Sequence, residues 1–491
     1  MKKVLAVWWK RLTFAAQNLL QNILRNLFCG LSRGMNMDMK SLEHIYEVYE
    51  RCGVVTTDSR HVPEGSLFVA LKGESFDGNR FAASALEKGA AAVLVDDATV
   101  VPEGDGRYIV CKDTLATLQA LAALHRQRFH GPVLQVTGTN GKTTTKELLA
   151  AVLSQRYRVL YTQGNLNNHI GVPLTLLRLR PNEHDFAIIE TGANHPGEIA
   201  DLTRIVQPDY GLITNVGRAH LEGFGSFEGV KRTKGELYDY LLSKQLSVFV
   251  NSSNTDLMDM LRQRGIAAGD SHLLTYCHEG SQPPLSTELA RGSVAACDPF
   301  LRVRWSTADG QVFDTPTHLI GDYNLDNVLT AAAVGLHFGV APNAISQALT
   351  DYQPSLGRSE LRLTPTNTLI VDAYNANLTS MHAALENFRR ISHPHKMVIL
   401  GDMKELGDAS NDAHLRIVSE VMGCDVEKAW FVGQAFTEAV CQLPEPKDMV
   451  VTAFPDVEAV KQALNDGCPQ HHLILIKGSN STRLHQLPDL L

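Results

Sequence analysis

The sequence predicts an α/β protein of three domains, each with helices packed on a sheet. The chain has 491 residues, which corresponds to about three domains at the usual ~150 residues per domain. From about residue 115 onward, short apolar runs typical of buried strands alternate with helical stretches, as in mostly parallel sheets covered on both faces. A segment at 353–357 that contains proline and glycine interrupts this alternation. It therefore predicts a domain boundary.

We expect a basic leader at 1–37, outside the fold, followed by domains at 38–114, 115–349 and 350–491. The leader has no acidic residue and carries Lys2, Lys3, Lys10, Arg11, Arg25 and Arg33. One interpretation is a helix on a membrane surface, but polar residues interrupt it and stable membrane insertion is not expected. We favour a start codon assigned too early, since Met35, Met37 and Met39 lie just before the globular pattern.

Composition and charge limit the class of protein. A hydrophobic content of 44% is that of an ordinary soluble enzyme. The net charge of -8 argues against a general nucleic-acid binder, which normally has a basic domain. The eight cysteines are scattered without a C-x-x-C pair. This pattern predicts reduced thiols in a cytoplasmic protein, with neither a disulfide framework nor a zinc site.

The stretch 133–145 has the pattern of a nucleotide phosphate loop. An apolar run leads into Gly-Thr-Asn-Gly-Lys-Thr-Thr and then into a helix. The glycines allow a sharp turn with inward N–H groups, the lysine supplies a cation, and the helix N-terminus favours anions. The alternative is a chance glycine turn between a strand and a helix. We favour phosphate binding by Gly138, Thr139, Asn140, Gly141, Lys142, Thr143 and Thr144, with the Thr143 hydroxyl on Mg²⁺.

Two later strands place further polar groups near this loop. The apolar strand 186–190 ends in Glu190, and ligands of parallel sheets lie at the carboxyl ends of strands. We therefore expect Glu190 to hold Mg²⁺. The strand 210–216 leads into a glycine-containing loop around His220. Such a histidine is more often a surface hydrogen bonder, but beside a phosphate loop we favour a functional role.

Motifs spread over residues 40–485 resemble those of the Mur ligase family. They are Thr57–Arg60, Leu71–Phe81, Gly138–Thr144, Gly321–Asn327, Gly357–Arg358, Asp372–Asn377, Gly401–Gly407 and Lys477–Ser479. The resemblance implies a small UDP-sugar-binding α/β domain, a central ATP-binding domain with a mostly parallel sheet, and a C-terminal Rossmann-like ligase domain. The sequence departs from the family pattern at Asn79, Tyr323 and Leu378, where histidine, histidine and proline are common.

Residues 164–173 and 374–377 resemble the branch of the family that adds D-alanyl-D-alanine to UDP-N-acetylmuramoyl-tripeptide. The Asp-Asn-Pro-Arg motif of the diaminopimelate-adding branch is absent. The resemblance thus implies a cytoplasmic, monomeric ligase that forms an acyl phosphate with ATP. The alternatives are a Mur ligase that adds a single amino acid, a phosphotransferase or NTPase with the same loop, and an inactive sugar-nucleotide-binding protein.

The resemblance also implies roles for single residues. Two Mg²⁺ ions would be held by Thr143, Glu190, His220 and Lys234, the last as a carbamate formed with CO₂ because an ammonium cannot bind Mg²⁺. By itself, the basic run around Lys234 is typical of a solvated helix face. The implied catalytic residues are Lys142, Lys234, His220 and Arg358; nucleotide contacts beyond the loop are Asn324, Asn327, Arg358, Asp372 and Tyr374. The implied substrate contacts are Ser59, Arg60, Lys72, Gly73, Asp77, Asn167, Asn168, His169, Asn375, Asn377, Lys477 and Ser479.

Overall fold

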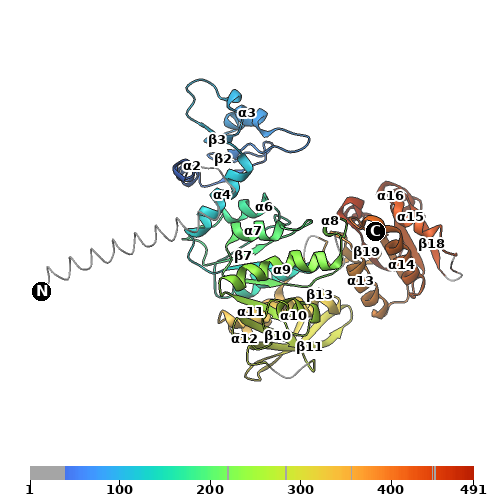
Figure 1. Ribbon diagram of the computed structural model, residues 1–491. Coiled ribbons are helices and arrows are strands. Elements are labelled where there is room, and N and C mark those ends of the chain that lie inside the picture. The colour runs from blue at the N-terminus through green and yellow to red at the C-terminus, as the bar shows by residue number, and fades with distance from the viewer. Residues whose placement is uncertain (1–38, 218–220, 282–284, 355–356, 445, 447–448) are drawn as a thin grey trace. The chain divides into compact units, whose positions relative to one another are not determined.

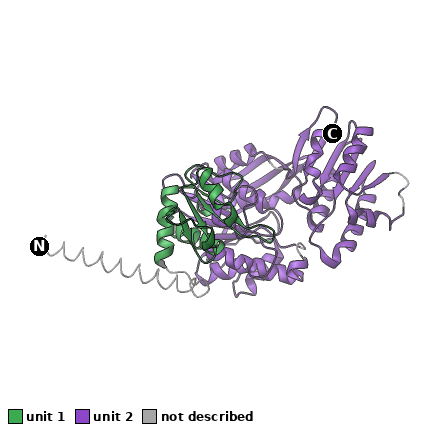
Figure 2. Cartoon of the chain, turned by 90° about the horizontal axis from the view of Figure 1, so that it is seen from above, with its two compact units in different colours: residues 1–129, 176–178 green, residues 130–175, 179–491 purple. Residues whose placement is uncertain are grey.

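The computed structural model describes residues 39–217, 221–281, 285–354, 357–444, 446 and 449–491. The predicted leader at 1–37 therefore lies outside the described residues, which begin at Met39. The chain divides into two compact units: one runs to Phe129 and includes Leu176–Arg178, and the other comprises His130–Thr175 and Leu179–Leu491 (Figure 2). In the part of the chain that is described, no helix has the length and apolar character needed to cross a membrane.

The first unit is built on a four-stranded parallel sheet in the order β1-β2-β3-β4. Its elements are α2 (Met39–Cys52), β1 (Val55–Thr56), β2 (Leu67–Val69), α3 (Ala82–Glu87), β3 (Ala92–Val95), β4 (Tyr108–Val110) and α4 (Thr114–Gln127). Phe68 and Val93 lie opposite each other in the sheet and pack against Ala82 and Ala85 of α3. The strands β2 and β3 lie within the short apolar runs at 66–71 and 91–95.

The second unit begins with a nine-stranded sheet in the order β13-β12-β11-β10-β9-β8-β5-β7-β6. Its strands are β5 (Val133–Thr137), β6 (Val159–Tyr161), β7 (Phe186–Glu190), β8 (Tyr210–Ile213), β9 (Ser247–Asn251), β10 (Leu273–His278), β11 (Glu288–Cys297), β12 (Phe300–Thr307) and β13 (Val312–Ile320). Pairing is parallel from β6 to β11 and antiparallel from β11 to β13. Because β5 lies between β7 and β8, the phosphate loop follows the strand at which the chain order reverses, where ligands of such sheets bind.

Helices cover both faces of this sheet, and the buried apolar residues form one core on each face. The helices α5 (Lys142–Leu153), α11 (Leu325–His337) and α12 (Pro342–Asp351) pack on one face. The other face carries α7 (Glu198–Val206), α9 (Phe227–Ser243) and α10 (Thr255–Arg262). Two short helices, α6 (Gly171–Leu176) and α8 (Leu221–Phe224), lie in the loops at the carboxyl ends of the strands.

The C-terminal part of the second unit is a six-stranded sheet in the order β14-β15-β19-β16-β17-β18, parallel except for β14. Its strands are β14 (Glu360–Leu363), β15 (Thr368–Asp372), β16 (Lys396–Gly401), β17 (Lys428–Val432), β18 (Val450–Phe454) and β19 (Leu473–Lys477). One face packs on α13 (Leu378–Arg390), α14 (Ser410–Met422) and α15 (Gln434–Val440), and the other on α16 (Val457–Asp466) (Figure 1). The predicted three-sheet α/β fold is confirmed.

Candidate active site

The two glycines of the phosphate loop stand where a side chain would collide with neighbouring strands and helices. Gly138 has φ +144, and a Cβ atom there would lie 2.0 Å from Oγ1 of Thr214. Gly141 is the N-cap of α5 with φ +76, and its Cβ would lie 2.6 Å from Oδ1 of Asn327. The loop can therefore pack this closely on its surroundings only with glycine at both positions.

The loop is held in shape by the segment that follows β8. Asn140 donates its N–H to Oδ1 of Asn215 at 3.0 Å, and its carbonyl accepts bonds from Oγ1 of Thr214 at 2.7 Å and Nδ2 of Asn215 at 3.1 Å. Nζ of Lys142 donates to the carbonyls of Gly138 and Thr139, both at 2.8 Å. Burial lowers the pKa of Lys142. The ammonium thus lies over the loop, close to the N–H groups that would meet a phosphate.

Glu190 lies at the carboxyl end of β7 and is fixed through both carboxylate oxygens. Oγ1 of Thr143 donates to Oε2 at 3.0 Å, and Nδ2 of Asn167 donates to Oε1 at 2.9 Å. Glu190 is buried, with 1% of its surface exposed. The structure thus brings together three residues that the sequence assigned to metal or substrate.

The oxygen groups around Glu190 suit Mg²⁺ only if the ligand supplies further oxygens. The described residues contain no group of three or more histidine, cysteine, aspartate or glutamate side chains that could hold a metal ion. Mg²⁺ in nucleotide enzymes is commonly bound by one or two carboxylates together with phosphate oxygens and waters. Thr143 and Glu190 fit that chemistry. The predicted metal ligand His220 lies outside the described residues.

Lys234 of α9 is buried and makes no hydrogen bond to any described residue. It is 3% exposed, and Nζ lies 5.6 Å from the ring centroid of Phe224. Burial, helped by the charge of Lys142, lowers the pKa of Lys234 to about 7, against the opposing effect of Glu198 and Glu236. The solvated helix face is therefore the wrong interpretation for Lys234.

Lys231 of the same helix is paired with two carboxylates instead. Its Nζ lies 2.7 Å from Oδ1 of Asp256 and 3.4 Å from Oε1 of Glu228. The hydrogen bond to Asp256 raises the pKa of Lys231. Of these two lysines, Lys234 therefore has the lower pKa and more readily provides the neutral amine that reaction with CO₂ requires.

Arg358 and Asn377 extend from the C-terminal sheet toward the phosphate loop. The Arg358 guanidinium lies 3.7 Å above the ring centroid of Tyr374, and its Nε is buried without a hydrogen-bond partner among the described residues. Burial lowers the pKa of Lys146, and the positive charge of Arg358 adds to this effect. Asn377 caps α13 and also donates from Nδ2 to Oδ1 of Asn140 at 2.8 Å.

Asn324 and Asn327 use their amides within the protein. Oγ1 of Thr145 donates to Oδ1 of Asn327 at 2.9 Å, and Nδ2 of Asn327 donates to Oδ1 of Asn324 at 2.7 Å. Both asparagines are buried. In this structure they tie the start of α11 to α5. The preceding residue, Tyr323, shares a hydrogen bond of 3.0 Å with the hydroxyl of Ser359.

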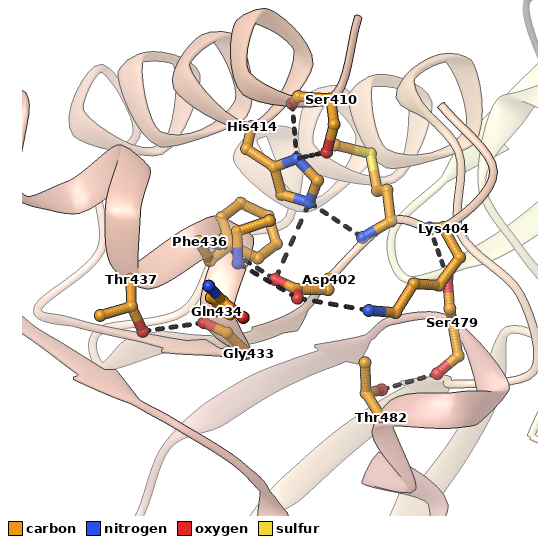
Figure 3. A network of polar contacts seen from close by, with 12 residues as sticks. Asp402, Lys404, Ser410, His414, Gly433, Gln434, Phe436, Thr437, Ser479 and Thr482 are labelled. Atoms are coloured by element: carbon orange, nitrogen blue, oxygen red, sulfur yellow. Dashed lines mark hydrogen bonds and ion pairs between the residues drawn. The ribbon is translucent and has the colours of Figure 1, made fainter. Parts of the chain in front are cut away.

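The carboxyl edge of the C-terminal sheet carries a dense polar network around Asp402 (Figure 3). Asp402 accepts the N–H of Phe436 at 3.0 Å, and Nζ of Lys404 lies 3.7 Å from its Oδ2 (Figure 3). The buried His414 accepts the N–H of Met403 at 3.0 Å. On the neighbouring strands, Asp372 and Lys477 form an ion pair. The motif Gly401–Gly407 is therefore held in place by contacts with α14 and α15.

Comparisons with known proteins agree over nearly the whole chain. Family models match at residues 52–126 (Mur ligase family, catalytic domain), 136–335 (Mur ligase middle domain) and 357–480 (Mur ligase, glutamate ligase domain). The UDP-N-acetylmuramoyl-tripeptide--D-alanyl-D-alanine ligase of Escherichia coli K12 is 34% identical over 439 residues, covering 88% of this chain and 92% of that protein. The chain belongs to the Mur ligase family.

Other relatives of this Mur ligase carry the same description. The Bacillus subtilis 168 protein of that name is 33% identical over 88% of this chain and 92% of its own length. A crystal structure of MurF from Acinetobacter baumannii has a TM-score of 0.76 at 31% identity, covering 89% of this chain and 92% of that chain. MurF of Thermotoga maritima in complex with ADP has a TM-score of 0.75 at 25% identity, covering 90% and 97%.

The predicted UDP-sugar residues of this Mur ligase lie in the first unit, at the carboxyl ends of its strands. Nζ of Lys72 lies 2.8 Å from Oδ1 of Asp96. Asn79 is buried and donates from Nδ2 to Asp77 and Asp96, both at 2.8 Å. Its amide thus links two loops that follow β2 and β3. Arg60 is exposed and forms hydrogen bonds with Asp58. Ser59 lies beside it in the loop after β1, and Gly73 lies beside Lys72 in the loop after β2.

The remaining predicted substrate residues are spread over several loops of the second unit. Asn168 starts α6 by accepting the N–H groups of Ile170 and Gly171 at 3.1 and 2.9 Å, and His169 beside it is exposed. Asn375 accepts the N–H of Ala376 at 2.8 Å. Ser479 accepts the N–H of Lys404 at 3.2 Å.

Two sets of site residues were missed from the sequence. Asn215 and Thr214 shape the phosphate loop, and Lys146 with Glu147 lies behind Glu190. The spacing offered one signal, because Lys146 stands four residues after Lys142 and so lies on the same face of α5.

Proposed function

We propose that this Mur ligase joins D-alanyl-D-alanine to UDP-N-acetylmuramoyl-tripeptide with ATP, as a cytoplasmic monomer in peptidoglycan precursor synthesis. The observation that carries the proposal is the full-length similarity to ligases of that description, 34% identical over 88% of this chain. The phosphate loop, Glu190 and Lys234 support an ATP-dependent ligase rather than an inactive binding protein, because the groups needed for phosphoryl transfer are all present.

The chemistry begins with a carboxylate, which is a poor electrophile. One oxygen of the tripeptide carboxylate attacks the γ-phosphorus of ATP, and the bond to the β-γ bridging oxygen breaks to release ADP. The amine of D-alanyl-D-alanine then attacks the acyl carbon of the acyl phosphate and loses a proton. Inorganic phosphate leaves with the former carboxylate oxygen, so an amide has formed.

Cations must offset the negative charge that gathers when a carboxylate approaches ATP. We assign this role to Lys142 and Arg358. Lys142 lies over the loop carbonyls, and the Arg358 guanidinium has a buried Nε that no described residue satisfies. An incoming phosphate oxygen would supply the missing acceptor. Asn324, Asn327, Asp372 and Tyr374 complete the proposed nucleotide site, with the two asparagines acting through the hydrogen bonds that join α11 to α5.

Thr143, Glu190, His220 and a carbamate on Lys234 would hold two Mg²⁺ ions. When bound, Mg²⁺ would neutralise phosphate charge and bring the carboxylate and the γ-phosphate together. Carbamate formation joins Nζ of neutral Lys234 to the carbon of CO₂ with loss of a proton, and so turns the amine into an oxygen ligand. The lowered pKa of Lys234 supports this assignment.

The carbamate has a direct test. Lys234→Ala should lose most activity and regain part of it with added acetate, which can occupy the vacated oxygen site. Lys231→Ala is the matched control and should keep its activity, with no effect of added acetate. Full activity of Lys234→Ala without acetate would contradict the assignment.

We further assign Ser59, Arg60, Lys72, Gly73 and Asp77 to the UDP-sugar. Substrate contacts in the second unit would be Asn167, Asn168, His169, Asn375, Asn377, Lys477 and Ser479. Residues 38–114, 115–349 and 350–491 would be the UDP-sugar, ATP and ligase domains.

The function is tested by phosphate release from ATP in the presence of UDP-N-acetylmuramoyl-tripeptide. We expect release to depend on D-alanyl-D-alanine and single amino acids to be poor replacements. Equal activity with a single amino acid would indicate another Mur ligase, and release without either peptide substrate would indicate an NTPase.

A further inference from the structure

Lys146 is a fully buried lysine behind the proposed metal site. It is 0% exposed, and its Nζ makes no hydrogen bond to any described residue. Instead the ammonium lies between two carboxylates, 3.7 Å from Oε2 of Glu190 and 3.8 Å from Oε1 of Glu147. A buried charge is costly unless it is paired. The position of Lys146 therefore calls for an explanation beyond packing.

The geometry of α5 explains how the ammonium reaches Glu190. Lys146 stands one helical turn after Lys142 and three residues after Thr143, so it shares their face of the helix. Thr143 and Lys146 thus approach the same carboxylate from successive turns of one helix. Asn167 contacts the other oxygen, Oε1, at 2.9 Å.

A second pair of residues supports the ammonium from behind. Glu147 accepts a hydrogen bond of 2.6 Å from the hydroxyl of Tyr352, the C-cap of α12. This bond fixes Oε2 of Glu147, while Oε1 faces Lys146. Tyr352, Glu147, Lys146 and Glu190 therefore form a continuous chain of polar contacts from the end of α12 to the end of β7.

We propose that Lys146 is a positioning residue for phosphoryl transfer, which orients the Glu190 carboxylate for Mg²⁺, and that the Glu147–Tyr352 hydrogen bond holds Lys146 in place. The proposal rests on the proposed function only through the use of Mg²⁺ and ATP. Lys146 touches neither nucleotide nor metal in this account. Its ammonium attracts Oε2 of Glu190, so that the hydrogen bonds from Thr143 and Asn167 do not alone decide how the carboxylate is turned. Groups that orient a metal ligand typically change metal affinity or activity by 10–100-fold.

The test measures how Mg²⁺ affects the binding of a non-hydrolysable ATP analogue, by equilibrium dialysis, so that neither peptide substrate is needed. The variants are Lys146→Met, Lys146→Arg and Tyr352→Phe. Lys396→Met is the matched control, because Lys396 is also a buried lysine, but its Nζ is bound by the carbonyls of Arg389 and Ile391 at 3.1 Å. Circular dichroism and thermal unfolding verify that each variant is folded.

We expect Lys146→Met to raise the Mg²⁺ concentration for half-maximal binding by about 10-fold or more, with binding in saturating Mg²⁺ changed far less. Lys146→Arg should recover part of the loss, and Tyr352→Phe should show a smaller loss that disappears when combined with Lys146→Met. Lys396→Met should lose stability but keep the wild-type Mg²⁺ dependence.

A wild-type Mg²⁺ dependence in folded Lys146→Met, or additive effects of Lys146→Met and Tyr352→Phe, would overturn the proposal. Should Lys146→Met not fold, an unchanged Mg²⁺ dependence in Tyr352→Phe would overturn it. Failure of the proposed function would appear separately, as wild-type protein that binds the analogue with Mg²⁺ yet does not ligate the dipeptide.

Discussion

At the scale of single residues, this Mur ligase places several cations where they are not fully paired. Lys142 binds only loop carbonyls, Lys234 has no hydrogen bond to any described residue, and Nε of Arg358 has no acceptor among them. In a resting protein such groups cost free energy. Their presence together around one loop is expected of a site built to receive a polyanion.

Replacement of the loop lysine tests this view most simply. We expect Lys142→Ala to lower kcat/KM for ATP by roughly 100-fold or more, since it removes a cation from the phosphates. The thermal midpoint should change little, because the side chain is only half-buried. Lys244→Ala, at the end of α9, serves as the control. Near-normal turnover in Lys142→Ala would exclude a phosphate-binding role for the loop.

The buried Lys234 should also be visible in the pH dependence of stability. Its pKa is lowered from 10.5 to about 7 in the folded protein. Between these values the unfolded state binds more protons, so the unfolding free energy should rise with pH, by at most about 1.4 kcal/mol per pH unit. Lys234→Met should remove this rise. The measurement is urea unfolding of both proteins from pH 7 to pH 9 in CO₂-free buffer without nucleotide; parallel curves would show that Lys234 does not titrate in this range.

At the scale of elements, the N-terminus of α13 serves both folding and function. Asn377 accepts the N–H of Ser380 at 2.9 Å and donates to Asn140 of the phosphate loop at 2.8 Å. Serine caps helices about as well as asparagine, but it has no amide to reach Asn140. Asn377→Ser therefore separates the two roles.

We expect Asn377→Ser to keep the thermal midpoint within about 2 °C and to lower kcat, because the contact between α13 and the loop is lost. The matched control is Asn254→Ser, which changes the N-cap of α10 in the same way without a contact to the loop. Wild-type kcat in Asn377→Ser would show that this contact has no part in turnover.

The sequence predicted the elements whose signal is local. The strand, glycine loop and helix at 133–153 are all present, and so is the predicted alternation of strands and helices in the C-terminal sheet. Glu190 was found because strand ends of a parallel sheet share an edge. The antiparallel pairing of β11, β12 and β13 was not predicted, since the apolar runs there did not differ from those of the preceding parallel strands.

Long-range burial explains the residues that the sequence did not reveal. Helical spacing places Lys146 on the same face of α5 as Lys142, but it does not reveal that Lys146 is buried. Its buried partners are Glu190, 44 residues later in the chain, and Glu147, which Tyr352 at the end of α12 holds. Asn215 likewise acts on a loop that belongs to another strand. Such contacts follow from the sheet order rather than from the residue pattern.

At the scale of the whole molecule, the phosphate loop and the C-terminal sheet contribute to one site in the second unit. Arg358 carries the clearest prediction. Arg358→Ala should lower kcat by about 10-fold or more while KM for ATP changes by less than about threefold, because the guanidinium is expected to act mainly in the transition state. Steady-state kinetics measure both constants, with Arg362→Ala, whose partner is the exposed Asp489, as the control. An equal loss in ATP affinity with kcat unchanged would contradict this role.

The central claim is that the tripeptide carboxylate becomes an acyl phosphate before the dipeptide attacks it. The most direct measurement uses UDP-N-acetylmuramoyl-tripeptide with ¹⁸O at both oxygens of the carboxylate that is joined to D-alanyl-D-alanine. Mass spectrometry then follows the released inorganic phosphate. The account predicts one ¹⁸O atom in each phosphate that is released during ligation of the dipeptide. Stoichiometric ligation that releases unlabelled phosphate would contradict it.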